Sequence, residues 1–473
     1  MEKKLLYRWD IKLLLMFTML VFYQNGNSQC STTGWQKLSQ GENFTLALKA
    51  DGTIWMWGVS FDGIMGTGSG DDTTLQHPTQ IGTDTDWTDI SAGRHFVLAL
   101  KNNGDLYGWG DNDWGNLGNG NQTDVFAPTL ISSSVRSFSA GYHHSTIVKT
   151  DGTLWGTGYN DWGGLGIGNS IGYVNVFTQE SSLATNWAKT TAGYYNSFGI
   201  KTDGTLWATG ANNERMTGTG LNVSELDDFT QVGTDTNWAS VSCGVYHVLG
   251  LKTNGKLWGW GASHNGRLGI PGAGSQYFST PQAIEATNNW TAASAGWDHS
   301  SAIRSDGALF CFGSNGGGKS GLESAGDTYN LAPVQVGTDT DWVSISNRLG
   351  VISSGAIKGD TTIWAWGADN YYQLGNYDGT ATNNHIPTQT TCTDALGLTD
   401  FTTKSVMLHP NPAENYIQIT TEQTIYSAKV FSIEGKLIKD MNTDSSTLYV
   451  GDLAKGTYFL RINNTAAQKF IKN

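Results

Sequence analysis

Short apolar segments recur along most of the chain and are separated by turns that are rich in glycine. Residues 96–100 form one such segment, and in another Trp55 and Trp57 stand two positions apart. A spacing of two places both side chains on one face of a β-strand. The segments are short and lack the spacing of three to four residues that is typical of amphipathic helices. The pattern therefore predicts an all-β fold.

One pattern occurs seven times: Asp or Asn, a turn residue, then Leu or Ile, an aromatic residue and a closing Gly. The closing glycines follow each other at 48 to 54 residues, at Gly58, Gly110, Gly158, Gly210, Gly261, Gly313 and Gly367. Asp-Gly and Asn-Gly pairs are typical of tight hairpin turns, because these residues accept positive φ angles at low cost. Only the seventh copy lacks the turn glycine, where Thr361 stands instead.

Most repeats also contain a step similar to Ser-Ala-Gly, and four have a loop with Leu-Gly. A repeat of about 50 residues suffices for one four-stranded blade, and radial repetition buries such blades without long exposed edges. The order Ser-Ala-Gly-x-x-His, Asp-Gly-x-Leu-Trp-x-Trp-Gly and Leu-Gly-x-Gly resembles the repeat of the RCC1 family over residues 30–391. The resemblance implies a seven-bladed β-propeller, which agrees with the seven copies. We place this domain at residues 30–392.

The repeat is irregular in three places, where we expect the ring to be least regular. Residues 347–349 replace a glycine step, Arg215-Met216-Thr217 replaces Leu-Gly in the fourth repeat, and residues 171–186 form a different loop.

After Cys392 the pattern changes to alternating strands with glycine turns, which predicts a small β-sandwich. The order Pro-Asn-Pro, Gly-Lys, Leu-x-x-Gly-x-Tyr and Lys-Phe-x-Lys over residues 405–473 resembles the C-terminal sorting domain (type A, Por) of the type IX secretion system of Bacteroidota. The resemblance implies the type IX secretion machinery as a partner. It also implies a secreted or cell-surface location, outside the outer membrane of a Gram-negative bacterium. We expect residues 393–404 to be a linker.

The N-terminus has the features of an export signal. Basic residues precede an apolar run at 13–23, which is shorter than the roughly 20 residues that a membrane-spanning helix needs. We expect residues 1–29 to be a signal peptide and no transmembrane segment to remain after its removal. Lipidation of Cys30 is disfavoured, because Asn27 stands where lipoprotein signals usually carry Leu.

Two of the 4 cysteines occupy nearly the same point of the repeat, Cys30 before the first repeat and Cys392 after the last. In a closed ring these points become neighbours, and an exported protein meets oxidising conditions. We therefore expect a Cys30–Cys392 disulfide across the ring closure. Cys243 and Cys311 fall at different repeat positions and are expected to be small buried residues.

Composition and charge narrow the possible functions. The net charge of -13 disfavours nucleic acid as a partner, because binding phosphates needs a basic face. The sequence has no nucleophile elbow, His-Glu-x-x-His motif, phosphate-binding glycine loop or Cys-x-x-Cys pair. We therefore predict no catalytic residue, no metal and no cofactor.

Three sets of polar residues recur with the repeat and are candidate sites. His144, His247 and His299 share one repeat position and could hold a metal, but a repeated hydrogen bond inside each blade explains them better. Pairs such as Asp84 and Asp86 could bind calcium, but they lack further carboxylates and are expected to form turns. A basic residue before each turn is expected to form a solvated rim: Lys49, Lys101, Lys149, Lys201, Lys252, Arg304 and Lys358.

Three aromatic residues on irregular loops are the candidate ligand-binding residues. Trp114, Trp162 and Tyr371 occupy the same loop position in repeats two, three and seven. Loop aromatics are common anchors of protein or glycan ligands, and the alternative is that they pack between blades.

Together these features predict an exported, monomeric, non-enzymatic binding propeller with an extracellular protein or glycan ligand. One alternative is an extracellular enzyme that works in the central channel of the propeller. Another is a nucleotide-exchange role by analogy with the RCC1 family, which export and the acidic charge disfavour.

Overall fold

The structure is a computed structural model of the chain. It describes residues 30–473 apart from 60, 69, 71–73, 286–288, 324–327, 348–352, 377–382, 393–406, 421–424, 426, 433–435, 442–445 and 463–467. The predicted signal peptide, the predicted linker and part of the irregular segment at 347–349 lie outside the described residues. The chain divides into two compact units between Cys392 and Thr393.

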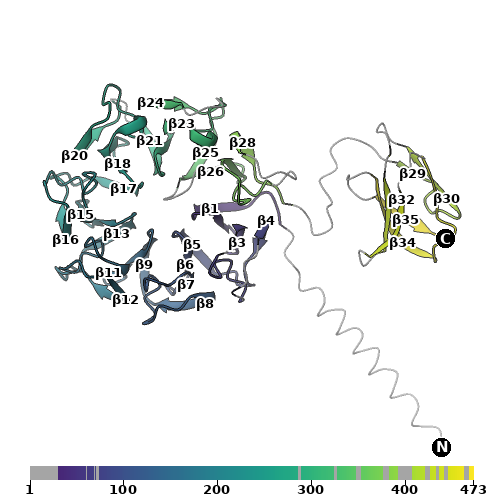
Figure 1. Cartoon of the computed structure of the whole chain (residues 1–473), viewed down its shortest axis with the longest axis horizontal. Helices are drawn as coiled ribbons and strands as arrows, with labels where there is room; N and C mark the ends of the chain where they lie inside the picture. The colour runs from purple at the N-terminus through teal and green to yellow at the C-terminus, as the bar shows by residue number, and fades with distance from the viewer. Residues whose placement is uncertain are drawn as a thin grey trace, which may run out of the picture. The chain divides into compact units, whose positions relative to one another are not determined.

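The first unit is a ring of seven four-stranded antiparallel sheets, counted over its described residues (Figure 1). Each blade consists of four strands that are consecutive in the chain, and the first strand of each blade lies nearest the centre of the ring. The first and seventh blades are neighbours, because β1 packs against β25 and β26. The predicted seven-bladed propeller is confirmed.

The strands of blades one to four have these bounds: β1 Trp35–Gln40, β2 Phe44–Lys49, β3 Ile54–Val59, β4 Thr74–Gln80, β5 Trp87–Ala92, β6 Phe96–Lys101, β7 Leu106–Gly110, β8 Val125–Ser132, β9 Val135–Ala140, β10 His144–Lys149, β11 Leu154–Tyr159, β12 Tyr173–Gln179, β13 Trp187–Ala192, β14 Asn196–Lys201, β15 Leu206–Ala211 and β16 Glu225–Gln231. Those of blades five to seven, with two short 3-10 turns, are β17 Trp238–Cys243, β18 His247–Lys252, β19 Leu257–Ala262, η1 His264–Gly266, β20 Tyr277–Ala283, β21 Trp290–Ala295, β22 His299–Arg304, β23 Leu309–Ser314, η2 Gly316–Gly318, β24 Tyr329–Gln335, β25 Trp342–Ser346, β26 Ser353–Lys358, β27 Ile363–Gly367 and β28 Asn384–Gln389.

The repeated Asp-Gly-Thr-x-Trp segment forms the turn between the second and third strands of a blade. In blade one, Asp51 accepts hydrogen bonds from the backbone N–H and the hydroxyl of Thr53, at 3.0 and 2.6 Å. The Thr53 hydroxyl in turn accepts from Trp55 Nε1 at 2.8 Å. One short motif therefore fixes the turn and the orientation of a core tryptophan.

The turn glycine also connects one blade to the next. The backbone N–H of Trp87, at the start of blade two, donates to Gly52 O of blade one at 3.2 Å. Gly52 has φ of 78°, and a Cβ there would lie 2.1 Å from Thr85 O. A side chain at this turn would therefore collide with the link between the blades.

The ring closure has the equivalent hydrogen bond between blades seven and one, although Thr361 stands in place of the turn glycine. Trp35 N donates to Thr361 O at 3.1 Å, and Thr361 has φ of 65°. The Thr361 hydroxyl accepts from Gly34 N at 2.8 Å, which gives the threonine a local partner at the seventh turn. The predicted Cys30–Cys392 disulfide closes the same boundary, with 5.4 Å between the two Cα atoms and a sequence separation of 362. Cys243 and Cys311 are free and buried, and burial raises the pKa of Cys311 to about 12.

The periodic basic residues are not a solvated rim, which corrects the expectation from sequence. Lys252 Nζ lies 4.8 Å from the ring centre of Trp238 and 3.9 Å from that of Trp258, and its side chain is only 5% exposed. It also pairs with Asp235 at 2.7 Å. Each of the seven cations lies over one or two aromatic rings of its own blade, where cation–π contacts and covered aliphatic stems stabilise it.

The second unit is a small β-sandwich, as predicted. Its strands are β29 Met407–His409, β30 Tyr416–Thr420, β31 Ala428–Ser432, β32 Leu437–Met441, β33 Thr447–Tyr449, β34 Gly456–Ile462 and β35 Gln468–Lys472. They form one sheet in the order β29-β30-β33 and a second in the order β32-β31-β34-β35. Alternate residues such as Ile417, Ile419, Val430 and Leu460 are buried in one core between the sheets. Over the described part of the chain, no helix has the length and apolarity to span a membrane.

Candidate ligand-binding face

The two faces of the propeller carry different connections. In an antiparallel four-stranded blade, the connections from first to second and from third to fourth strand lie on one face. We call this the loop face. The Asp-Gly turns and the links between blades lie on the opposite, turn face. The predicted binding residues Trp114, Trp162 and Tyr371 all follow the third strand of their blades and lie on the loop face.

The structure brings two of these three residues into one aromatic network. Trp114 packs edge-on against Tyr159, with ring centres 5.0 Å apart, and Tyr159 lies 5.3 Å from Tyr195. Trp162 stacks on the same Tyr195 at 6.5 Å. Both tryptophans are half-buried, so they pack against the next blade and also present ring surface to solvent. Tyr371 lies in blade seven, outside this network, and is 40% exposed.

Sequence reasoning missed a second set of aromatic residues on the same face. They lie in the connections between first and second strands of blades three to six, and we call them the aromatic arc: Tyr142, Tyr194, Tyr195, Tyr246 and Trp297. Tyr142 and Tyr194 are 4.1 Å apart between ring centres, and Tyr246 and Trp297 are 6.3 Å apart. The sequence contains a pattern that could have predicted the arc, since an aromatic residue follows the glycine of the Ser-Ala-Gly step within two positions in four successive repeats.

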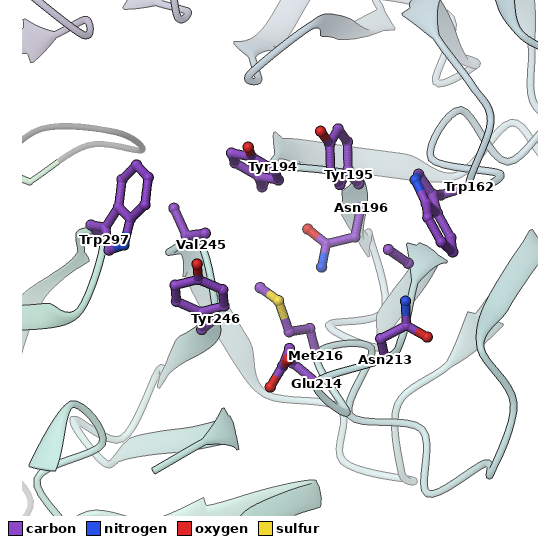
Figure 2. Close-up of a pocket in the computed structure, with 11 residues that line it drawn as sticks. Trp162, Tyr194, Tyr195, Asn196, Asn213, Glu214, Met216, Val245, Tyr246 and Trp297 are labelled. Carbon is purple, nitrogen blue, oxygen red and sulfur yellow. The ribbon is translucent and has the colours of Figure 1, made fainter. Parts of the chain in front are cut away.

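A pocket of about 230 Å³ opens within the arc, at the boundary of blades four and five (Figure 2). Trp162 and Tyr195 stand on one side of it and Trp297 on the other. Asn196 and Glu214 supply polar atoms to its lining. An apolar, aromatic cavity with a few polar groups is the usual form of a small-ligand site.

The loop face of blades one and two is charged instead of aromatic. Glu42 accepts a hydrogen bond from Arg94 Nε at 2.6 Å and lies 3.0 Å from His95 Nε2. Burial alone would raise the pKa of Glu42, but hydrogen bonds from His95 and Arg94 outweigh it and lower the pKa to about 2. The Arg94 guanidinium also lies 4.9 Å from the ring centre of Tyr142, so it joins the charged and aromatic parts of this face.

The titratable side chains of the aromatic network are neutral near pH 7. Burial, with the neighbouring Asp161, raises the pKa of Tyr159 to about 12, and burial beside Tyr194 does the same for Tyr195. Burial, followed by the charge of Arg94, lowers the pKa of His143 to about 4. The phenols therefore keep their protons, and each already has a hydrogen-bonding neighbour, Asp161 for Tyr159 and Tyr194 for Tyr195.

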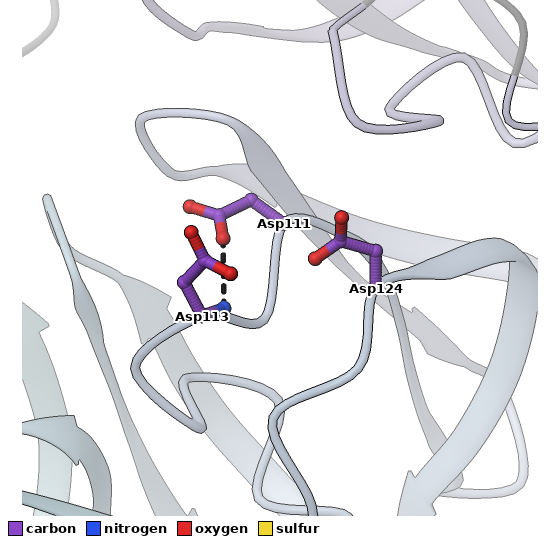
Figure 3. Close-up of side chains that lie close together, drawn as sticks. All are labelled: Asp111, Asp113 and Asp124. Carbon is purple, nitrogen blue, oxygen red and sulfur yellow. Dashed lines mark hydrogen bonds between the residues drawn. The ribbon is translucent and has the colours of Figure 1, made fainter.

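A group of three carboxylates in blade two was not foreseen from sequence (Figure 3). Asp111, Asp113 and Asp124 each place an oxygen within 4.8 Å of the others. Asp111 accepts from Asp113 N at 2.8 Å, and Asp124 accepts from Asn112 N at 2.9 Å. Burial raises the pKa of Asp111 and of Asp124. These bonds show the carboxylates bracing the backbone of their own loop, and we assign no ion to them.

The three periodic histidines form hydrogen bonds between blades, which corrects the prediction that they bond inside a blade. His144 Nε2 lies 2.9 Å from Ser197 Oγ of the next blade. Because the Ser197 hydroxyl donates its proton to Gly164 O at 2.7 Å, the histidine must be the donor. The other two pairs have the same form: His247 with Ser300 at 2.7 Å and His299 with Ser354 at 2.9 Å.

The paired aspartates before blades two and seven are ion-paired to the periodic lysines of those blades. Lys101 contacts Asp84 at 2.7 Å and Asp86 at 3.0 Å, and Lys358 contacts Asp339 at 2.6 Å. These carboxylates therefore neutralise cations of the turn face in addition to shaping the links.

Comparison with known proteins agrees with this architecture. Residues 24–350 match the RCC1-like domain family, and residues 407–473 match the secretion system C-terminal sorting domain. The chain is similar to the ultraviolet-B receptor UVR8 of Arabidopsis thaliana, with 26% identity over 354 residues that cover 72% of this chain and 78% of UVR8. It is also similar to the mitochondrial RCC1 domain-containing protein RUG3 of the same plant, with 25% identity over 332 residues that cover 70% of this chain and 65% of RUG3.

Among solved structures, human WBSCR16 shares the fold. It superposes with a TM-score of 0.62 at 17% identity, over 72% of this chain and 94% of that protein. At this identity the likeness shows the fold and nothing further.

Proposed function

The chain belongs to the RCC1-like domain family and ends in a secretion sorting domain, and from this premise we propose that it is an exported, non-enzymatic binding propeller. Its loop face holds an extracellular ligand. The observation that carries the proposal is the aromatic arc with its pocket, joined by Trp114 and Trp162. Exposed aromatic residues on loops that a rigid scaffold positions are the usual anchors of a bound ligand.

The chemistry of the pocket favours binding over catalysis. Within its described lining Glu214 is the one carboxylate, whereas hydrolysis of glycosides uses a pair. The neighbouring Tyr159 and Tyr195 phenols hold their protons at neutral pH and are therefore poor bases. A nucleotide-exchange role is disfavoured by export and by the net charge of -13.

The two ends of the chain supply the route out of the cell. We propose that residues 1–29 direct passage across the inner membrane, and that residues 405–473 address the type IX secretion machinery of a bacterium of the Bacteroidota. Residues 393–404 then link the propeller to its tail. The propeller acts as a monomer on the cell surface or in the medium.

The test is capture of ligands by the immobilised chain from the culture medium and from surface glycans. Three proteins are compared: the parent, a Trp114→Ala/Trp162→Ala variant and a Tyr329→Ala control. Tyr329 begins the outermost strand of blade six, β24, is 52% exposed and does not line the pocket, so it matches the removal of an exposed ring outside the aromatic arc and its pocket.

We expect the parent and Tyr329→Ala to hold the same ligand and the double variant to lose it. Adding Tyr371→Ala shows whether the site extends to blade seven. Equal capture by the parent and the double variant would move the site away from these tryptophans, and no capture by any of them would contradict a binding function.

A further inference from the structure

The pocket of the aromatic arc lies at a blade boundary where the residues depart from the repeat. Three blade boundaries carry a His–Ser hydrogen bond beneath the loop face. At the boundary of blades four and five, Asn196 stands in the histidine position and Val248 in the serine position. Cys243 stands there where the neighbouring repeats have Ala192 and Ala295, and its thiol lies 3.1 Å from Asn196 Oδ1.

This change leaves a shorter side chain at the base of the pocket. Asn196 lacks the imidazole ring that fills the three boundaries with a His–Ser bond, and it lines the cavity (Figure 2). Blade four is also the repeat in which Arg215-Met216-Thr217 replaces Leu-Gly, and Met216 lines the same pocket. Two independent departures from the repeat therefore meet at one cavity.

Flat aromatic surfaces form opposite walls of the cavity. Trp162 and Tyr195 are nearly parallel, with 28° between their planes, and they present ring faces from blades three and four. Trp297 stands opposite, edge-on to Tyr246 at 73°. Walls of this kind suit a ring-shaped ligand whose faces are apolar and whose edge is polar.

Two polar side chains at the pocket have no hydrogen-bond partner among the described residues. Asn213 is exposed and Glu214 is half-buried, and both line the pocket. Glu214 occupies the loop position that holds Trp114 and Trp162 in the preceding blades. A carboxamide and a carboxylate together can accept from and donate to neighbouring hydroxyl groups of one ligand.

The pocket has neighbouring charges of both signs, and the Arg267 guanidinium and the Glu214 carboxylate already offset each other, so neither is left to bind a charged ligand. The Arg267 guanidinium already lies 5.1 Å from the ring centre of Tyr246, so a ligand cation there would meet a like charge. An acidic ligand would meet the carboxylate of Glu214. A neutral polyhydroxylated ring avoids both repulsions.

From this geometry we infer that the pocket binds a neutral pyranose saccharide, stacked between the aromatic walls and hydrogen-bonded by Asn213 and Glu214. The inference rests on the proposed binding function and names its ligand class. The volume of about 230 Å³ suits one sugar ring, and the open side of the arc leaves room for the rest of a glycan chain.

The test is saturation-transfer NMR on the chain without its signal peptide, with glucose, galactose, mannose and N-acetylglucosamine as separate probes. Glucuronic acid and choline are the acidic and cationic comparisons. We expect transfer to at least one neutral sugar and none to glucuronic acid or choline at equal concentration.

Two variants locate the site. Asn213→Ala/Glu214→Ala removes the free polar groups, and we expect at least a tenfold loss of sugar affinity. Asn196→His/Cys243→Ala/Val248→Ser restores the residues of the neighbouring repeats and should fill the pocket, with the same loss. Tyr329→Ala is the matched control and should bind as the parent does, and each variant is accepted only if its thermal unfolding remains cooperative.

Absence of transfer from all four neutral sugars, preference for choline or glucuronic acid, or full sugar binding by both pocket variants would overturn the inference. The proposed function has a separate readout. If the capture experiment still yields a protein ligand that depends on Trp114 and Trp162, the binding function stands and only the saccharide is rejected.

Discussion

The turn face and the loop face are built from the same repeats but differ in how regular they are. On the turn face the same contacts recur around the ring: Asp151 accepts from Thr153 as Asp51 does from Thr53, and Lys201 lies over two tryptophans as Lys252 does. On the loop face the equivalent positions change from a charged group in blades one and two to the aromatic arc in blades three to six.

The contrast indicates that the turn face mainly stabilises the ring and that the loop face mainly serves binding. Turn-face side chains are satisfied by neighbours within the ring, so each copy holds one blade to the next. Loop-face side chains repeat no single contact around the ring, and variation there creates a pocket without loss of the fold. Substitutions on the turn face should therefore change the free energy of unfolding, and substitutions on the loop face should change binding.

The largest effect is expected from the disulfide at the turn-face closure. Cys30→Ser/Cys392→Ser releases a loop of 362 residues in the unfolded chain, and we expect it to lower the free energy of unfolding by roughly 3–5 kcal/mol. Urea denaturation measures the loss. The parent in reductant should match the variant, and a loss below about 1 kcal/mol would show that hydrogen bonds alone hold the closure.

A smaller effect is expected at a single turn. A Cβ on Gly204 would lie 2.0 Å from Thr236 O, and Gly204 has φ of 79°. We expect Gly204→Ala to cost roughly 2–4 kcal/mol in urea denaturation.

The matched variant is Thr361→Gly at the ring closure. The variant removes the strain of a threonine at a φ of 65°, but it also loses the 2.8 Å hydrogen bond from Gly34 N. Because these effects oppose each other, we expect the free energy of unfolding to change by no more than about 1 kcal/mol. Equal losses in both variants would contradict the idea that the link to the next blade is what requires glycine.

A graded effect, of about 1 kcal/mol for each histidine by pH 5.5, is expected from acid, and it acts beneath the loop face. Burial lowers the pKa of His144 to about 4, and burial with the charge of Lys319 lowers that of His299 to about 3. The unfolded chain takes up protons near pH 6.5 and the folded chain does not, so the free energy of unfolding should fall as pH drops from 6.5 towards 4. One such shift corresponds to roughly 3 kcal/mol when complete, but only part of it is lost at pH 5.5.

A variant with phenylalanine at these positions provides the control, because blades one and two already carry Phe44 and Phe96 there. His144→Phe/His299→Phe should reduce the dependence between pH 6.5 and 4 in urea denaturation, and the part that remains is expected from His247 and His143, whose pKa values burial also lowers. Glu42, with its pKa of about 2, adds a separate loss below pH 4.5 that this variant should retain. An unchanged slope above pH 4.5 would assign the acid sensitivity to other groups.

The fold was predictable because its determinants are local and repeated. Asp-Gly turns, alternating aromatic residues and a constant spacing define a blade without reference to distant residues, and the two cysteines share a repeat position. Contacts that cross a boundary were harder to predict. The histidines share a position in their blades, but their serine partners lie 53 to 55 residues away in the next blade.

The candidate site was predicted only in part for the same reason. Trp114 and Trp162 were found as departures within their own loops, whereas the arc combines residues of four blades. The exchange of His and Ser for Asn196 and Val248 is visible in the sequence, but its meaning depends on the two residues facing each other across one boundary. The lysines were misjudged because their charge suggested solvent, while their ring contacts are set by strand pairing.

Because the ring is closed, any blade could in principle come first in the sequence. Every blade is complete within four consecutive strands, and the Cα atoms of Cys30 and Cys392 are 5.4 Å apart. A short peptide could join these two points, and the chain could then be opened at another blade link, such as 233–236, without dividing a sheet. The propeller is thus a natural substrate for circular permutation, in which the entry point of the chain moves while the pocket between blades four and five stays where it is.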